Sequence, residues 1–113
     1  MPSGSSVSVR VFSPPRSRDQ LLELVREHLP ALGRAIPLKR VVLFGSWASG
    51  RATAFSDVDL LVVYGGPPRT DAYVLVRKLL PVRGLEPHVY AEADAAALGG
   101  TVERMTRDGI VLL

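Results

Sequence analysis

Apolar residues recur every three or four positions after Ser17, which predicts an amphipathic helix lying on a core. Ser17 and Gln20 have the spacing of a capping box, so we expect the helix to begin there. Pro30 is expected to end or kink the helix, because proline lacks an N–H and clashes with the preceding turn. The stripe consists of Leu21, Leu24, Val25, His28, Leu29 and Leu32.

Three short apolar runs, at residues 38–44, 58–64 and 85–90, predict strands. The second run is apolar almost throughout, so we expect a central strand that is covered on both faces. Helices are predicted from a cap at Thr70 to about residue 80, and over residues 91–107 with a break at two glycines. This order predicts an α+β fold of two layers, with a small mixed sheet and helices packed on one face.

The length of 113 residues, without an internal repeat, predicts one domain over residues 17–113. Residues 1–16 are expected to form an N-terminal extended segment, and the alternation over residues 7–11 is compatible with an edge strand. No apolar run approaches the roughly 18 residues that span a bilayer, and the N-terminus lacks the apolar core of a signal peptide. We therefore expect a cytoplasmic protein that does not contact a membrane.

The chain has no cysteine and only two histidines, so disulfides, thiol catalysis and cysteine-based zinc sites are excluded. Any metal would need oxygen ligands. Lys and Arg together number 14 against 11 Asp and Glu, a balance compatible with nucleotide, nucleic acid or protein partners. Because the basic residues are scattered, we expect a solvated surface and do not expect direct binding of nucleic acid.

Candidate chemistry gathers where the first strand ends and the second begins. Asp57 and Asp59 are two positions apart, so in a strand both carboxylates point to one face, roughly 6.6 Å apart along the chain. Their mutual repulsion is relieved by a divalent cation such as Mg²⁺, which takes carboxylate, water and phosphate oxygens. Gly45 allows close backbone approach to a phosphate, and Ser46 opens a turn whose N–H groups can bind an anion. The pattern indicates a metal and phosphate site.

Gly45-Ser46, ten residues, and then Asp57-x-Asp59 resembles the signature of nucleotidyltransferases with the DNA polymerase β-like fold. The short length resembles the minimal nucleotidyltransferases. The resemblance covers most of the chain from about Ser17 onward, including the Ser-Asp-x-Asp-Leu continuation and the Asp-Gly-Ile-Val-Leu ending. It implies a polymerase β-like nucleotidyltransferase fold for this domain.

The resemblance also implies a ligand set. ATP would be the nucleotide donor, and two Mg²⁺ ions would be held by Asp57, Asp59 and a third carboxylate from a later strand. Glu86 takes that role here, although the family more often has Asp and although Pro87 beside it cannot donate to a sheet ladder. The phosphates would be contacted by Gly45, Ser46, Ser49 and Arg51, where Ser49 replaces the family's usual Arg and Arg51 is expected to substitute for it.

Two aromatic residues near these positions have alternative roles. His88 lies on the same face as Glu86 by the alternation of a strand, where it meets substrate or an acid, or is a hydrogen-bonded residue of the sheet. Trp47 either stacks on a base or covers the first turn after Gly45.

The function that the resemblance implies is transfer of a nucleoside monophosphate, AMP from ATP, onto a hydroxyl. Minimal nucleotidyltransferases are typically antitoxins paired with an all-helical HEPN toxin, which they can inactivate by adding AMP to a tyrosine. For this chain, either a homo-oligomer or a hetero-oligomer would be compatible with such a role. One alternative is a non-catalytic antitoxin that binds nucleotide and neutralises its partner by occlusion. Another is a stand-alone transferase acting on a small hydroxylated compound.

Overall fold

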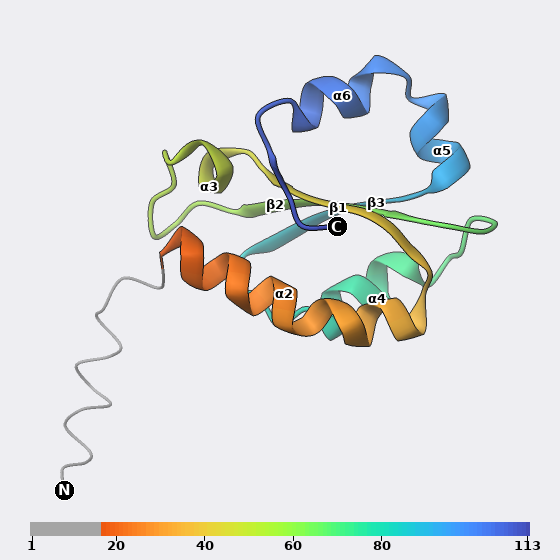
Figure 1. The fold of residues 1–113 in the computed structure, drawn as a ribbon, viewed down its shortest axis with the longest axis horizontal. Coiled ribbons are helices and arrows are strands. Elements are labelled where there is room, and N and C mark those ends of the chain that lie inside the picture. Colours follow the sequence, from red (N-terminus) through yellow and green to blue (C-terminus); the bar gives the residue numbers. More distant parts are fainter. Residues whose placement is uncertain (1–16) are drawn as a thin grey trace, which may run out of the picture.

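The computed structural model describes residues 17–113, so the segment predicted for residues 1–16 lies outside the described residues. Four strands form one mixed sheet in the order β3, β2, β1, β4 (Figure 1). They are β1 (Leu38–Phe44), β2 (Val58–Tyr64), β3 (Leu85–Ala91) and β4 (Ile110–Val111). β1 is antiparallel to β2 and β4, whereas β2 and β3 are parallel. The predicted α+β fold with a small mixed sheet is confirmed, and the apolar tail supplies its fourth strand.

Helices lie on both sides of this sheet (Figure 1). They are α2 (Arg18–Ala35), α3 (Ser46–Ser49), α4 (Ala72–Leu79), α5 (Glu92–Ala97) and α6 (Gly100–Thr106). The prediction of helices on one face holds for α2 and α4, whereas α5 and α6 add cover on the opposite face. The break predicted at the two glycines separates α5 from α6, and Gly99 has a positive φ of 57°. Among residues 17–113, no helix combines the length and the apolar character that crossing a membrane requires.

β2 is the central strand, because it lies between β1 and β3 and its side chains enter two separate cores. Leu60 and Val62 pack on the side of α2 and α4. Leu61 and Val63 pack on the other side, against Val102 of α6. Successive side chains of a strand point to opposite faces, so the continuous apolar run is needed to fill both cores. The predicted burial of this strand on both faces is confirmed.

α2 begins at the predicted capping box. The Ser17 hydroxyl accepts a hydrogen bond from Gln20 N at 3.2 Å, and Ser17 N donates to Gln20 Oε1 at 2.8 Å. The helix continues through Pro30 to Ala35, so of the two predicted effects of this proline, an end of the helix is wrong and a kink stays a prediction. Leu32, which lies beyond the proline, has no exposed surface, and Ile36 has 1%. Burying two such side chains contributes roughly 3–6 kcal/mol, which offsets the ~3 kcal/mol cost of an internal proline.

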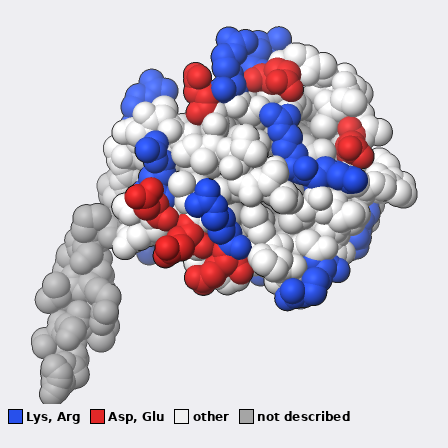
Figure 2. Space-filling model, viewed as in Figure 1, with Lys and Arg blue, Asp and Glu red and all other residues white. Residues whose placement is uncertain are grey.

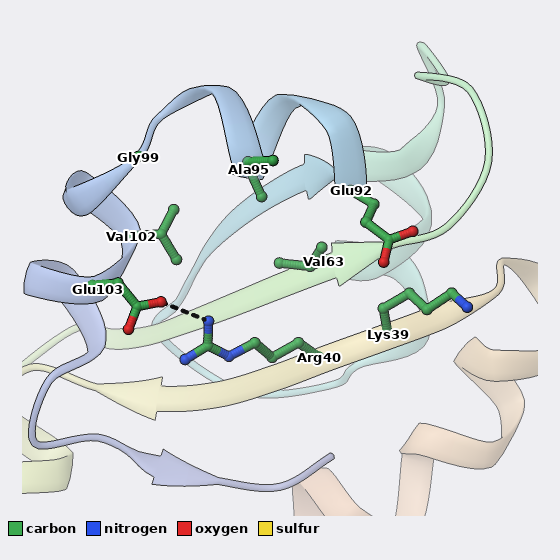
Figure 3. Close-up of a pocket in the computed structure, with 9 residues that line it drawn as sticks. Lys39, Arg40, Val63, Glu92, Ala95, Gly99, Val102 and Glu103 are labelled. Atoms are coloured by element: carbon green, nitrogen blue, oxygen red, sulfur yellow. Dashed lines mark ion pairs between the residues drawn. The ribbon is translucent and has the colours of Figure 1, made fainter.

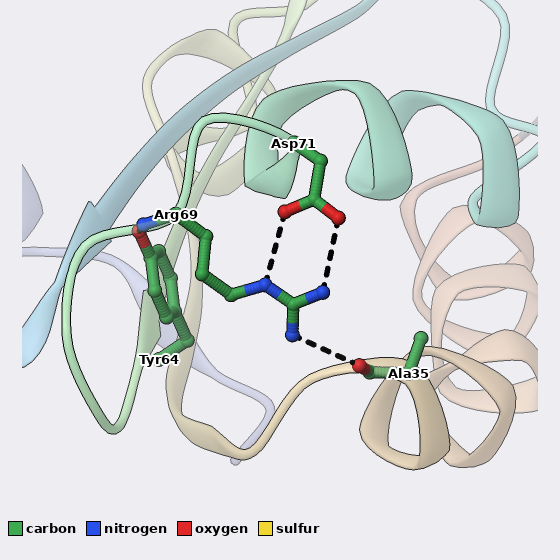
Figure 4. A network of polar contacts seen from close by, with 4 residues as sticks. All are labelled: Ala35, Tyr64, Arg69 and Asp71. Carbon is green, nitrogen blue, oxygen red and sulfur yellow. Dashed lines mark hydrogen bonds and ion pairs between the residues drawn. The ribbon is translucent and has the colours of Figure 1, made fainter.

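α4 begins at Ala72, so Thr70 does not cap it as predicted. Arg69 instead organises the turn, because its guanidinium makes two hydrogen bonds to the Asp71 carboxylate, at 2.9 and 3.0 Å (Figure 4). The same guanidinium donates to Ala35 O at 3.2 Å, and Arg69 N donates to the Tyr64 hydroxyl at 2.8 Å. The hydrogen bond from Arg69 lowers the pKa of Asp71 below its ordinary value. This cluster joins the ends of α2 and β2 to the start of α4.

Candidate functional site

Three neighbouring strands bring predicted site residues into one row. Asp59 of β2 is in register with Phe44 of β1 on one side and with Glu86 of β3 on the other. Side chains of residues in register point to the same face, so the carboxylates of Asp59 and Glu86 lie on one side of the sheet. Gly45 follows Phe44 directly, and the exposed Asp57 precedes β2 at the same end. The register therefore places Glu86 beside Asp59.

Pro87 does not interrupt β3. The strand continues through it to Ala91, and Pro87 is in register with Leu60. β3 is the last strand on its side of the sheet and pairs only with β2 in the described part of the chain. An edge strand has one side without a ladder partner, so a residue lacking an N–H is tolerated there. The departure from the family pattern at Pro87 is thus compatible with the position of Glu86.

Gly45 provides the space that the Asp59 carboxylate occupies. Its backbone has φ 75° and ψ −151°, a conformation that is essentially restricted to glycine. A Cβ atom on Gly45 would lie 2.4 Å from Asp59 Oδ2 and 3.2 Å from its Cγ. Sequence reasoning predicted a glycine for close approach to a phosphate. In the structure the group that approaches Gly45 is the carboxylate.

The other oxygen of the same carboxylate faces His88. Asp59 Oδ1 lies 3.5 Å from His88 Nε2, and the two side chains are 29% and 30% exposed. The His88 ring also packs against Phe44, with ring centroids 5.0 Å apart. The contact is an ion pair only when the imidazole is protonated. The same contact is a hydrogen bond between residues of neighbouring strands, so it fits both roles predicted for His88, contact with an acid and a hydrogen-bonded residue of the sheet.

The carboxylates of the candidate site are oxygen ligands of the kind that a hard cation prefers, although the described side chains do not form a complete coordination shell. No three Asp, Glu or His side chains within residues 17–113 come close enough together to hold a metal ion. Mg²⁺ is typically bound by one or two carboxylates and completes its shell with water and substrate phosphate. Asp57 and Asp59 meet that requirement, and the space left by Gly45 keeps the second carboxylate in place. The residues present therefore fit Mg²⁺, and the role of Glu86 as a third ligand stays a prediction.

α3 and the chain after it form the side of the site. Gly50 ends the helix with φ 82°, and Arg51 N donates to Ser46 O at 3.0 Å. The Arg51 side chain turns back, and its Nε donates to Ser49 Oγ at 3.1 Å. Arg51 therefore lies against Ser49, where the family usually has an arginine. This contact supports the predicted substitution, while phosphate binding by Ser46, Ser49 and Arg51 stays a prediction.

Two contacts from outside the motif hold α3 in place. Arg18, the first residue of α2, donates through Nη1 to Ala48 O at 2.9 Å. Trp47 is only 8% exposed, and its Nε1 donates to Ser56 O at 3.4 Å, just before Asp57. The ring is thus buried in the core, which agrees with the structural role considered for Trp47. The part played by Arg18 has no local sequence signal, because 30 positions separate it from its partner.

A pocket of about 320 Å³ lies at the other end of the same sheet face (Figure 3). Val63 lines it from β2 and Val102 lines it from α6 on the opposite side (Figure 3). Lys39 and the ion pair of Arg40 with Glu103, at 3.7 Å, also line it. A bulge in β1 between Leu38 and Arg40 shifts the register at this point. None of the predicted site residues lines this pocket.

Charges on the face seen in Figure 2 are mixed. Lys and Arg side chains are interspersed with Asp and Glu rather than gathered in one basic patch. Phosphate-directed binding of nucleic acid requires a continuous basic surface. The absence of direct nucleic-acid binding stays a prediction that this face supports.

The fold and the acidic row define a domain of the nucleotidyltransferase type, and the comparisons agree. The family model described as "Nucleotidyltransferase domain" matches residues 19–110, so the chain belongs to this family. No curated protein matches the chain.

Two solved structures share the fold. A candidate nucleotidyltransferase from Sulfolobus solfataricus is 21% identical, with a TM-score of 0.59 over 83% of this chain and 80% of that chain. A mutant of the toxin–antitoxin MntA–HpeT is 18% identical, with a TM-score of 0.50 over 87% of this chain and 73% of that chain. At these identities the likeness establishes the fold, and membership of the family supports transferase activity in general.

Proposed function

We propose that the chain is a Mg²⁺-dependent nucleotidyltransferase that transfers AMP from ATP to a hydroxyl group. The observation that carries the proposal is the row of Asp59 and Glu86 at the strand ends, with Asp59 seated against Gly45. Family membership supports the general reaction, and the donor set supports the metal. The adenine base and the use of ATP come from the resemblance to minimal nucleotidyltransferases.

The reaction joins the acceptor oxygen to the α-phosphorus of ATP. The bond from that phosphorus to the oxygen bridging to the β-phosphate breaks, pyrophosphate leaves, and the hydroxyl proton passes to solvent. Bound Mg²⁺ would lower the pKa of the acceptor hydroxyl and offset the charge on the leaving pyrophosphate. Asp57 and Asp59 would hold the cation with Glu86 as an additional ligand, and Gly45 and Ser46 would orient the β- and γ-phosphates.

The acceptor that we propose is a tyrosine of a partner toxin of the HEPN type, so that the chain acts as an antitoxin. The shared fold with the MntA–HpeT toxin–antitoxin pair supports a toxin partner. The protein in that structure is a mutant with two aspartates, two positions apart, replaced by glutamate. The same spacing separates Asp57 and Asp59 in this chain.

A second candidate function is that of a non-catalytic antitoxin that binds its partner and blocks it. The observation that favours it is that no three acidic or histidine side chains converge in residues 17–113. The two functions predict the same complex and differ in whether the partner becomes labelled.

Incubation of the protein with labelled ATP, Mg²⁺ and the product of the adjacent reading frame separates them. The enzyme predicts label on the partner that disappears with Asp57→Asn and persists with Asp108→Asn, a matched control on an exposed turn. A tight complex without transfer would exclude the enzyme and support occlusion. If the adjacent frame encodes no small helical protein with Arg and His four to six residues apart, a small hydroxylated compound becomes the preferred acceptor.

A further inference from the structure

The segment between α3 and β2 ends in a tight turn, residues 53–56, that hydrogen bonds hold together. Thr53 N donates to Ser56 Oγ at 2.9 Å, and Ser56 N donates back to Thr53 O at 3.1 Å. Phe55 N donates to Thr53 Oγ1 at 3.3 Å. The indole of Trp47 then joins Ser56 to the core. The turn therefore presents one defined backbone conformation.

Phe55 projects from this turn with 95% of its surface exposed, more than any other large apolar side chain in residues 17–113. A phenylalanine side chain in contact with water lacks the stabilisation that burial of its apolar surface would provide. An aromatic ring on an ordered turn can be buried by a partner with little further loss of conformational entropy. These are the properties of the aromatic anchors that dominate protein interfaces.

The position of Phe55 limits which acceptors would cover it. It precedes Asp57 by two residues, so the two Cα atoms are at most about 7 Å apart. A protein partner typically covers about 800 Å² of its target, a patch with a radius of roughly 16 Å. A protein that brings a hydroxyl to Asp57 therefore has a contact area large enough to include Phe55. A small hydroxylated compound can reach Asp57 without contact with Phe55.

We propose that Phe55 is an anchor for the protein that carries the acceptor hydroxyl, and that it inserts into an apolar socket beside that hydroxyl. The proposal rests on the proposed function, and it adds the residue of this chain through which a protein acceptor is recognised. In this proposal the turn at residues 53–56 selects the acceptor, whereas the transfer takes place at Asp57, Asp59 and Glu86.

The test compares Phe55→Ala with Tyr73→Ala, an aromatic control at the start of α4. Tyr73 is 45% exposed and lies beyond the far end of β2, about 20 Å from Phe55 by the rise of that strand. The affinity for the purified product of the adjacent reading frame is measured by calorimetry, without nucleotide. Label transfer from ATP is then measured to that protein and to N-acetyltyrosinamide, a small hydroxyl acceptor.

We expect Phe55→Ala to weaken binding of the protein acceptor at least tenfold and to lower its labelling equally, with labelling of N-acetyltyrosinamide and the melting temperature unchanged. Tyr73→Ala should leave both labelling reactions unchanged. Equal affinities of wild type and Phe55→Ala would overturn the proposal. So would equal losses with the protein and the small acceptor, which would place Phe55 in the transfer site. Binding that depends on Phe55 without transfer by the wild type would refute the proposed enzyme and retain the anchor.

Discussion

Replacement of Gly45 by alanine tests most sharply how the backbone and Asp59 fit together. The residue has φ 75° and ψ −151°, where a side chain costs about 1–3 kcal/mol. The added Cβ would also lie 2.4 Å from Asp59 Oδ2, about 1 Å inside the 3.4 Å at which ordinary contact begins. Relief of such an overlap typically costs a further ~1–3 kcal/mol. We therefore expect Gly45→Ala to lower the free energy of unfolding by about 2–6 kcal/mol.

The overlap also predicts a loss of function beyond the loss of stability. The Asp59 carboxylate has to move by about 1 Å, and a displacement of that size at a reacting site costs about 100-fold in rate. Urea denaturation measures the first effect, and Mg²⁺-dependent ATP binding and label transfer below the melting temperature measure the second.

Gly66→Ala is the matched control for this experiment. Gly66 has φ 87° in a turn at the other end of β2, and an added Cβ would meet nothing within 4 Å. Gly66→Ala should be destabilised only by the strained backbone conformation of that residue, and it should keep ATP binding and label transfer. If Gly45→Ala binds ATP and transfers label like the wild type while folded, the space beside Asp59 has no functional role.

Three further substitutions test single features. Pro30→Ala should raise the free energy of unfolding, measured by urea denaturation, by about 1–3 kcal/mol, because it restores an N–H and relieves the clash in α2. An unchanged free energy of unfolding would mean that α2 tolerates the proline without cost. Asp71→Asn should lower the melting temperature at neutral pH. Because the hydrogen bond from Arg69 lowers the pKa of Asp71 in the folded protein, this stabilisation is present above the unfolded pKa of about 3.9 and is lost as pH falls through the folded value. The melting temperatures of wild type and Asp71→Asn should therefore converge in acid, below the unfolded pKa. A difference that stays constant with pH would contradict the ion pair. Glu86→Gln should leave the melting temperature nearly unchanged, because the side chain is exposed, and lower label transfer at least tenfold; unchanged transfer would exclude it as a ligand.

The strands β1, β2 and β3, the capping box of α2 and the glycine break after α5 were predictable because each depends on residues close together in the chain. Ser17 and Gln20 are three positions apart, and the apolar run of β2 carries its own burial pattern. The length of α2 beyond Pro30 was not predictable, since it depends on the burial of Leu32 and Ile36 against the sheet. A proline rule that considers only local geometry misses this compensation.

The candidate site was predictable in composition and only partly in arrangement. The alternation of a strand predicts that Asp57 and Asp59 share one side, but β2 begins at Val58, so only Asp59 lies within the strand and the shared side stays a prediction. The place of Glu86 beside Asp59 depends on the register of two parallel strands, which residues 27 positions apart cannot specify. The contact of Arg18 with α3 joins two segments whose packing is set only by the whole fold.

The placement of α5 and α6 on the second face also needed the structure. The apolar residues of α5 are all alanines, and α6 adds only Val102 and Met105. These helices pack against Leu61 and Val63 of β2 through Ala95, Val102 and Met105. Helices of six and seven residues give too few turns for a reliable apolar stripe. The fold class was therefore predicted correctly from the sequence, whereas the position of α5 and α6 on the second face of the sheet was not predicted.

The central claim is that the carboxylates of Asp57 and Asp59 bind a nucleotide through Mg²⁺. The most direct measurement is calorimetric titration of ATP into wild type, Asp59→Asn and Asp108→Asn, with Mg²⁺ and with a chelator. We expect wild type and Asp108→Asn to bind ATP only with Mg²⁺, and Asp59→Asn to bind at least tenfold more weakly while remaining folded by circular dichroism. Wild-type binding that is equally strong with the chelator, or undiminished binding by Asp59→Asn, would contradict the claim.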